Sequence, residues 1–142
     1  MSKTASYLHK VQYYETDQMQ VVHHSNYFRW YEEARTAFME SIDLGYANLE
    51  AMGIIIPVTA VESEYIGAAQ YPQTIEIKSR IIKFSGVRMT VKYELYNTET
   101  QDLINRGTSE HAFVDQNFCP FALQKKYPEV YQTLLDYTVK ES

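Results

Sequence analysis

The sequence holds a single cysteine and no long apolar run, and each scarcity excludes a class of protein. Because Cys119 is alone in a chain of 142 residues, an internal disulfide framework and a multi-cysteine metal site are both excluded. No stretch approaches the roughly 20 apolar residues that a membrane-spanning helix needs. The first residues, MSKTASYLHKVQYY, also lack the apolar run of a signal peptide. We therefore expect a cytoplasmic protein without a membrane span, in which Cys119 is a small buried residue.

Positive charge is outweighed by negative charge, and the formal net charge is −5. This balance argues against nonspecific binding to nucleic acid or to anionic membranes. An anionic ligand would need a local basic patch. Apolar residues make up 45% of the chain and charged residues 22%, which is typical of a globular protein. At this length we expect one domain that covers residues 1–142.

Aromatic residues are abundant, with 13 Tyr, 6 Phe and 1 Trp. Such side chains bury large areas and line apolar pockets and interfaces. Two interpretations stay open from composition alone. The tyrosines can form a core and an ordinary surface, or they can line a ligand tunnel or a subunit contact.

A helical pattern begins near Asn26. Bulky apolar residues recur there at intervals of three and four, which places them on one face of a helix. These residues are Tyr27, Trp30, Tyr31, Ala34 and Phe38. Ser25 or Asn26 can cap the start of this long helix, and Gly45 is a candidate stop signal. A second, short helix is expected at Tyr46–Met52.

Strand patterns occupy the rest of the chain. Alternating apolar and polar residues, or short β-branched runs, predict strands over about 7–14, 54–61, 75–81, 89–95 and 103–114. Turns are expected at Ser85-Gly86 and at 97–102, and a short helix after Pro128. One long helix and one antiparallel sheet can bury each other's apolar faces. The sequence therefore predicts an α+β fold with the sheet wrapped around a central helix.

Asp17 and the start of the long helix form the most informative segment. Asp17 stands seven residues before His24, which lies at or just ahead of the helix start. The unpaired N–H groups of a helix N-terminus can stabilise an oxyanion, and a carboxylate beside them can attack a carbonyl or activate water. Such a pair is a minimal acyl-transfer site that needs no serine, cysteine or metal. From spacing alone, Asp17 can equally be a helix cap or a solvated loop residue.

The same segment resembles the signature of the 4-hydroxybenzoyl-CoA thioesterase family and its short-chain acyl-CoA thioesterase relatives. The matching residues are Tyr14, Thr16, Asp17, Val21, Val22, His24, Tyr27, Trp30 and Glu32. Pro57-Val58, Tyr71-Pro72 and the strand that ends at Asp115 extend the similarity over most of the chain. The resemblance implies a hot-dog fold and an active site at a dimer interface, where Asp17 meets a pocket partly built by its neighbour.

The resemblance also implies roles for individual residues. Asp17 would be the catalytic nucleophile or general base, and His24 would offer its backbone N–H to the oxyanion. Tyr27, close to the helix start, would wall the acyl pocket. Gln20 departs from the family pattern, which has glycine there. His23 stands where the family often has an aromatic residue, and adjacent histidines on an extended segment point apart, so no metal and no cofactor are expected.

A basic stretch runs from Lys78 to Lys92 without an acidic residue. Its cations are Lys78, Arg80, Lys83, Arg88 and Lys92. They can be strand-edge residues that discourage aggregation, or they can neutralise the phosphates of coenzyme A. The resemblance places the pantetheine arm near the hairpin turn. The substrate contacts that it implies are Lys83, Ser85, Gly86, Val87 and Arg88.

The function expected from this resemblance is hydrolysis of an acyl-CoA to free acid and coenzyme A by a homodimer or homotetramer. The acyl group can be aromatic or a short to medium aliphatic chain, and acyl-carrier protein can replace coenzyme A. A second enzyme hypothesis is a hydroxyacyl-thioester dehydratase, in which His24 would work with Asp17 or Glu33. A third hypothesis is a noncatalytic acyl-thioester binding module on the same scaffold.

Overall fold

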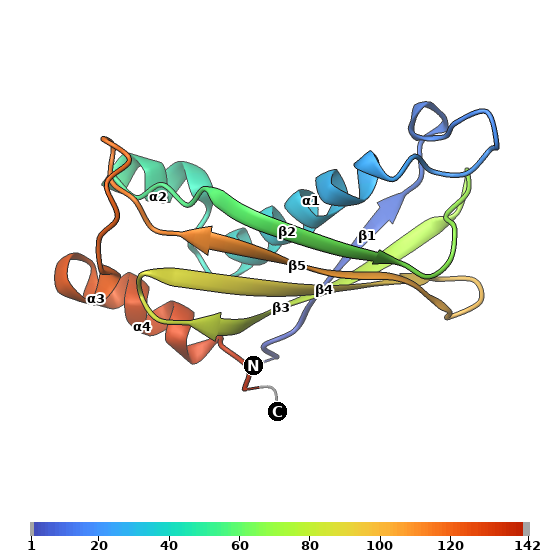
Figure 1. The fold of residues 1–142 in the computed structure, drawn as a ribbon. Coiled ribbons are helices and arrows are strands. Elements are labelled where there is room, and N and C mark those ends of the chain that lie inside the picture. The colour runs from blue at the N-terminus through green and yellow to red at the C-terminus, as the bar shows by residue number, and fades with distance from the viewer. Residues whose placement is uncertain (1, 141–142) are drawn as a thin grey trace.

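A five-stranded antiparallel sheet, in the order β1-β3-β4-β5-β2, forms one layer of the protein (Figure 1). The computed structural model describes residues 2–140. The strands are β1 (Ala5–Lys10), β2 (Val58–Tyr65), β3 (Thr74–Phe84), β4 (Arg88–Asn97) and β5 (Leu103–Ala112). Because β1 and β2 lie at the two ends of this order, each leaves one backbone edge without a strand partner within the described chain.

The long helix α1 (Ser25–Ser41) lies along one face of the sheet and supplies the second layer (Figure 1). Its aromatic stripe is buried, with Trp30 at 0% and Tyr31 at 1% exposure. Alternate residues of β3 and β4 are buried as well, among them Ile77 and Tyr93, because successive strand residues point to opposite faces. The rings of Tyr31 and Tyr93 stack with centroids 4.4 Å apart. The predicted α+β class and the hot-dog arrangement of a sheet around a helix are confirmed.

The end of α1 differs from the prediction. The helix ends at Ser41, and Asp43 takes a left-handed backbone conformation with φ 64°. A residue in that conformation commonly ends a helix. Asp43 therefore terminates α1, a role that the sequence pattern predicts for Gly45. Gly45 has φ −55° and is the N-cap of the next helix, α2 (Tyr46–Met52), which begins and ends as predicted.

The strand boundaries are predicted better late in the chain than early. β1 ends at Lys10, and the 3-10 turn η1 (Tyr13–Glu15) replaces the strand expected up to residue 14. β2 starts at Val58 rather than Ile54, because Ile55 instead forms an isolated bridge with Val114. The β3–β4 and β4–β5 turns lie where the sequence places them.

The C-terminal helices cover one end of the sheet. They are α3 (Leu123–Lys126) and α4 (Pro128–Asp136), and the second follows the prediction of a helix after Pro128. Before them, Cys119 is exposed, so its predicted burial is wrong. The Asp115 carboxylate accepts the N–H groups of Asn117 and Cys119, which turns this segment outward.

No helix within residues 2–140 is long and apolar enough to cross a membrane.

Candidate active site

Asp17 lies in a tight loop between η1 and α1. Its N–H donates to the Val21 carbonyl at 2.9 Å, and the Gln20 N–H donates to the Asp17 carbonyl at 3.0 Å. One carboxylate oxygen, Oδ1, accepts the Met19 N–H at 2.8 Å. The side chain is exposed, and Oδ2 has no hydrogen-bond partner within residues 2–140. One oxygen therefore holds the loop and the other is available to a substrate or a water molecule.

A polar hollow of about 190 Å³ borders this carboxylate. The other residues that line it are Tyr13, Thr16, Gln20, Gln70 and Tyr71. The rings of Tyr13 and Tyr71 meet edge to face, with centroids 5.8 Å apart, at its rim. The carboxylate of Asp17 thus opens into a space large enough for water molecules or a small polar group.

Gln20 has φ 65°, a conformation in which a β-carbon costs about 1–2 kcal/mol. The loop therefore keeps the backbone shape that glycine would favour, at an energetic cost. We expect Gln20→Gly to raise the free energy of unfolding by about 0.5–1 kcal/mol, since the greater freedom of glycine in the unfolded chain offsets part of the gain. Chemical denaturation measures this change. Gln18→Gly in the same loop, where φ is not positive, is the control and should lower stability.

The start of α1 is tied to residues just ahead of the Asp17 loop. The His23 N–H donates to the Glu15 carbonyl at 2.9 Å, and the Asn26 side chain donates to the same oxygen at 3.0 Å. His24 is the N-cap, and no side chain of the described residues caps the helix. The prediction that Ser25 or Asn26 caps the helix is therefore wrong, because the Asn26 side chain instead donates its amide N–H to the Glu15 carbonyl. Among residues 2–140 no acceptor binds the His24 N–H.

The two adjacent histidines do not point apart as expected. Their rings lie 4.2 Å apart between centroids, because the chain has already turned into helical geometry at His24. His23 Nδ1 shares a hydrogen bond with the Ser25 hydroxyl at 2.8 Å, and the His24 carbonyl accepts the Tyr65 hydroxyl at 3.3 Å. No group of three or more His, Cys, Asp or Glu residues in the described chain could hold a metal ion.

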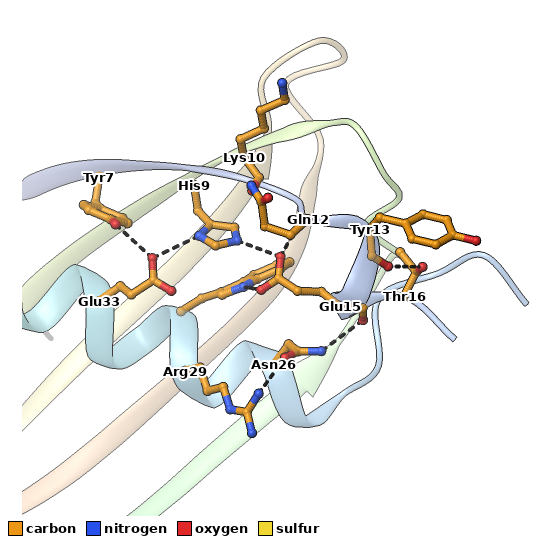
Figure 2. Close-up of polar contacts among 11 residues, drawn as sticks. Tyr7, His9, Lys10, Gln12, Tyr13, Glu15, Thr16, Asn26, Arg29 and Glu33 are labelled. Carbon is orange, nitrogen blue, oxygen red and sulfur yellow. Dashed lines mark hydrogen bonds and ion pairs between the residues drawn. The ribbon is translucent and has the colours of Figure 1, made fainter. Parts of the chain in front are cut away.

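A polar cluster joins β1, η1 and α1 through His9, Glu15, Trp30 and Glu33 (Figure 2). Glu15 is 4% exposed, and its carboxylate accepts hydrogen bonds from the Gln12 N–H (2.7 Å) and the Trp30 indole (2.7 Å). Its third contact is His9 Nε2 at 2.9 Å. Burial alone would raise the pKa of the Glu15 carboxyl, but these hydrogen bonds outweigh it, and the pKa lies below its usual value. Glu15 is therefore held as an anion. Nothing in the local sequence distinguishes it from a solvated residue.

A second hollow, of about 240 Å³, lies between α1 and β2. The residues that line it are Phe28, Arg29, Tyr31, Glu32, Arg35, Val58, Val61 and Ser109. Tyr27 is absent from this wall because it is 2% exposed and packs edge to face on Tyr65. Burial raises the pKa of Tyr27 above its usual value. Phe28, which lies off the apolar stripe, is the aromatic residue nearest the helix start that reaches this space.

The hairpin turn between β3 and β4 lies far from Asp17 within one chain. Lys83 is nine residues beyond Thr74 along β3, or about 30 Å at the rise of a β-strand. The Asp17 loop lies at the Thr74 end, since Val11 donates to the Gln73 carbonyl there. The residues predicted to contact the substrate at the opposite end are Lys83, Ser85, Gly86, Val87 and Arg88. One chain does not bring them together with Asp17.

The cations of the basic stretch differ in their surroundings. Arg80 forms an ion pair with Glu94 at 2.8 Å, and Lys78 lies 5.0 Å from the centre of the Tyr96 ring. The side chains of Lys83 and Arg88 are exposed and have no ion-pair partner in residues 2–140. These two are therefore the cations available for an anionic ligand.

The sequence pattern of the Thioesterase-like superfamily matches residues 11–132 of this chain. The protein belongs to this superfamily. The matched region contains the Asp17 loop, all of α1 and every strand except β1. Both segments of the candidate site therefore lie within the part of the chain that the superfamily shares.

Individual relatives and a solved structure agree with this assignment. The chain is 32% identical over 121 residues to the putative acyl-CoA thioesterase YneP of Bacillus subtilis, covering 84% of this chain and 87% of the relative. It is 24% identical over 129 residues to the acyl-CoA thioesterase YbgC of Helicobacter pylori, covering 85% and 95%. The crystal structure of a DHNA-CoA thioesterase from Staphylococcus aureus superimposes with a TM-score of 0.89 at 30% identity, covering 94% of this chain and 89% of that one.

Proposed function

We propose that this protein is an acyl-CoA thioesterase that releases a free acid and coenzyme A. The free Oδ2 of Asp17 carries the proposal; its loop lies between Glu15 and the start of the long helix, which hydrogen-bonds to the Glu15 carbonyl. The unpartnered His24 N–H at that helix start supplies an oxyanion donor. Membership of the Thioesterase-like superfamily, and relatives named as acyl-CoA thioesterases, support the same chemistry.

Hydrolysis follows from these two groups. Asp17 takes a proton from water, and the hydroxide adds to the thioester carbonyl carbon. The carbonyl oxygen becomes an oxyanion that accepts the His24 N–H at the positive end of α1. The carbon–sulfur bond then breaks, and the thiolate leaves with the proton that Asp17 holds. In the alternative route the Asp17 carboxylate itself attacks the carbonyl carbon, the carbon–sulfur bond breaks and the thiolate leaves, and water then hydrolyses the resulting anhydride to the free acid and the Asp17 carboxylate.

The open edge of β2 points to a homodimer as the active form. The side chains of Val58, Val61 and Tyr65 are exposed, and within residues 2–140 the strand pairs with β5 alone. Such an edge is a template for another strand. A twofold pairing of β2 with β2 would be antiparallel and closed. It would set the Tyr65 end of one strand, beside His24, against the Val58 end of the other. Two such dimers would make the homotetramer.

This pairing would bring the partner's hairpin turn to the Asp17 end of the sheet. Val58 pairs with His111, and Ala112 pairs with Arg88, so the hairpin lies at the Val58 end of its own sheet. Lys83 and Arg88 of one subunit would then approach the Asp17 site of the other. Their free charges suit the phosphates of coenzyme A.

Mixing two defective variants tests the shared site. A double variant that combines Lys83→Ala and Arg88→Ala should raise KM for acyl-CoA by roughly tenfold or more, because charge-assisted contacts to the phosphates are lost. The matched acyl-pantetheine, which lacks the nucleotide, should show no such change. The double variant is then mixed one to one with Asp17→Asn and assayed at a substrate concentration below KM. Half of the dimers that form should contain one subunit of each variant and therefore one native site out of two. The mixture should recover roughly a quarter of wild-type activity. No recovery after subunit exchange would place all the groups in one chain.

The acyl group is proposed to occupy the hollow between α1 and β2. Its volume of about 240 Å³ is small for a ligand pocket, and Phe28, Val58 and Val61 make it largely apolar. An aromatic or a short to medium aliphatic acyl group fits such a space better than a long chain. The neighbour from Staphylococcus aureus is named a DHNA-CoA thioesterase.

Thiol release from a panel of thioesters tests the proposed function. The panel runs from acetyl-CoA to palmitoyl-CoA and includes benzoyl-CoA and 1,4-dihydroxy-2-naphthoyl-CoA. We expect release from short, medium or aromatic substrates, and none from palmitoyl-CoA. If no acyl-CoA releases thiol, the same acyl groups on acyl-carrier protein decide between a carrier-protein thioesterase and a binding module. The form of the dehydratase hypothesis that pairs His24 with Glu33 gains no support, because Glu33 contacts Tyr7 and His9 rather than His24.

A further inference from the structure

The Glu15 backbone joins the two segments of the candidate site. Its carbonyl accepts the His23 N–H and the Asn26 side chain, on either side of His24. Two residues further on, the Asp17 N–H donates to the Val21 carbonyl. Any movement of residue 15 would therefore shift the loop that carries Asp17 relative to the start of α1.

The His9 ring fixes this junction from β1. Its Nε2 lies 2.9 Å from Glu15 Oε1, and its Nδ1 lies 3.0 Å from Glu33 Oε1 (Figure 2). An ionised carboxylate accepts hydrogen bonds and cannot donate them. Both ring nitrogens must therefore carry protons, or one of the two carboxyl groups must. The cluster of His9, Glu15 and Glu33 holds one proton more than a neutral histidine between two carboxylates would hold.

Within residues 2–140, the other charged groups near this cluster lie on the open side of Glu33. Tyr7 on β1 donates its hydroxyl to Glu33 at 2.8 Å. From α1, the Trp30 ring lies 4.7 Å from the His9 ring, and from β3 the residue opposite His9 is the buried Ile75. On the open side of Glu33, a hollow is lined by one cation, Arg29, and by two further carboxylates, Glu32 and Glu40.

We propose that His9 is a positioning residue of the thioesterase site, which rests on the function proposed above. In its doubly protonated form it holds the Glu15 carboxylate, and the Glu15 backbone then sets Asp17 and the His24 N–H in their working geometry. Loss of the cluster's proton leaves a ring nitrogen facing an acceptor, and one of the two hydrogen bonds breaks. We therefore expect kcat to fall as the pH rises and the cluster loses this proton.

The pH dependence of kcat tests the proposal together with the fluorescence of Trp30. Trp30 is the only tryptophan of the protein, and it donates to Glu15 and lies against His9. In the wild type, kcat should fall on the alkaline side with the same midpoint as a change in Trp30 fluorescence. His9→Gln should lower kcat by roughly 10- to 100-fold, as expected for a misplaced catalytic group, and should abolish both transitions.

Two further variants separate positioning from stability. Glu33→Gln removes one of the two charges that favour the extra proton, so the kcat transition and the fluorescence transition should both move to lower pH, and by the same amount. Tyr7→Phe removes only a hydrogen-bond donor to Glu33. In this variant the fluorescence transition and the fall in kcat should still share one pH midpoint. Both variants remain informative if His9→Gln fails to fold.

Three outcomes would overturn the proposal. The first is a fluorescence transition that kcat does not follow, and the second is a kcat profile that Glu33→Gln leaves in place. The third is a wild-type fluorescence that does not change with pH. Absence of thiol release from every thioester, with the fluorescence transition intact and altered by His9→Gln, would instead refute the proposed function and with it the role of His9 in turnover.

Discussion

Asp17→Asn is expected to lower kcat/KM for thioester hydrolysis by at least about 10²-fold, the range for loss of a general base. Asparagine keeps an oxygen that can accept the Met19 N–H, so the loop retains the bond that Oδ1 makes now. It loses the negative charge and the basic Oδ2. Thiol release measures the effect, and an unchanged melting temperature shows that the fold is intact.

The chain contains a matched control for this substitution. Asp115 opens a second loop in which its N–H donates to the Cys119 carbonyl at 3.0 Å and its carbonyl accepts the Phe118 N–H at 2.9 Å. Its Oδ1 accepts the Asn117 N–H at 2.8 Å, and Phe118 has φ 61°, just as Gln20 has φ 65°. Asp115 Oδ1 also accepts the Cys119 N–H at 3.0 Å, a bond without a counterpart at Asp17 in residues 2–140, and otherwise Asp115→Asn makes the same change in a closely similar loop.

The two variants separate a catalytic carboxylate from a structural one. If Asp17 only shapes its loop, both substitutions should have small and similar effects. If it performs the chemistry, Asp17→Asn alone should abolish turnover while acyl-CoA binding survives. Full activity in Asp17→Asn would mean that another group activates the nucleophile.

Gly107→Ala is expected to lower the free energy of unfolding by about 3 kcal/mol, at the upper end for overpacking of a core. Gly107 lies on β5 directly beneath Tyr31, where α1 comes close to the sheet. A β-carbon there would lie 2.8 Å from Cζ of Tyr31 and would also collide with the Glu62 carbonyl. The Tyr31 ring cannot move aside easily, since its hydroxyl is hydrogen-bonded to Ser63 and Asn105.

Gly45→Ala is the matched control for that prediction. A β-carbon at Gly45 would lie 3.4 Å from the Glu40 side chain, an ordinary contact, and φ is −55°. The loss should stay below about 1 kcal/mol, the usual effect of a poorer helix N-cap. Urea unfolding of both variants measures the difference. Equal stabilities would show that the β5–α1 contact relaxes more readily than its hydrogen bonds suggest.

Local patterns predicted the long elements because each depends on residues a few positions apart. The spacing of Tyr27, Trp30 and Phe38 is a property of one helix face, and it holds in the structure. Helix ends were less predictable. Asp43 and His24 occupy the positions expected of other residues because termination depends on backbone conformation and on which side chains are already bonded elsewhere.

The sequence by itself determined the superfamily, the α+β fold and the placement of Asp17 just before a long helix, since these follow from short-range spacing and a local motif. Only the tertiary structure decided which polar residues lie inside. His9, Glu15 and Glu33 look like surface residues in the sequence, yet the packing of β1 and η1 on α1 joins them. It likewise buries Tyr27, exposes Phe28 and separates Lys83 from Asp17. Those relations depend on strand register and helix packing between distant segments, which no local pattern encodes.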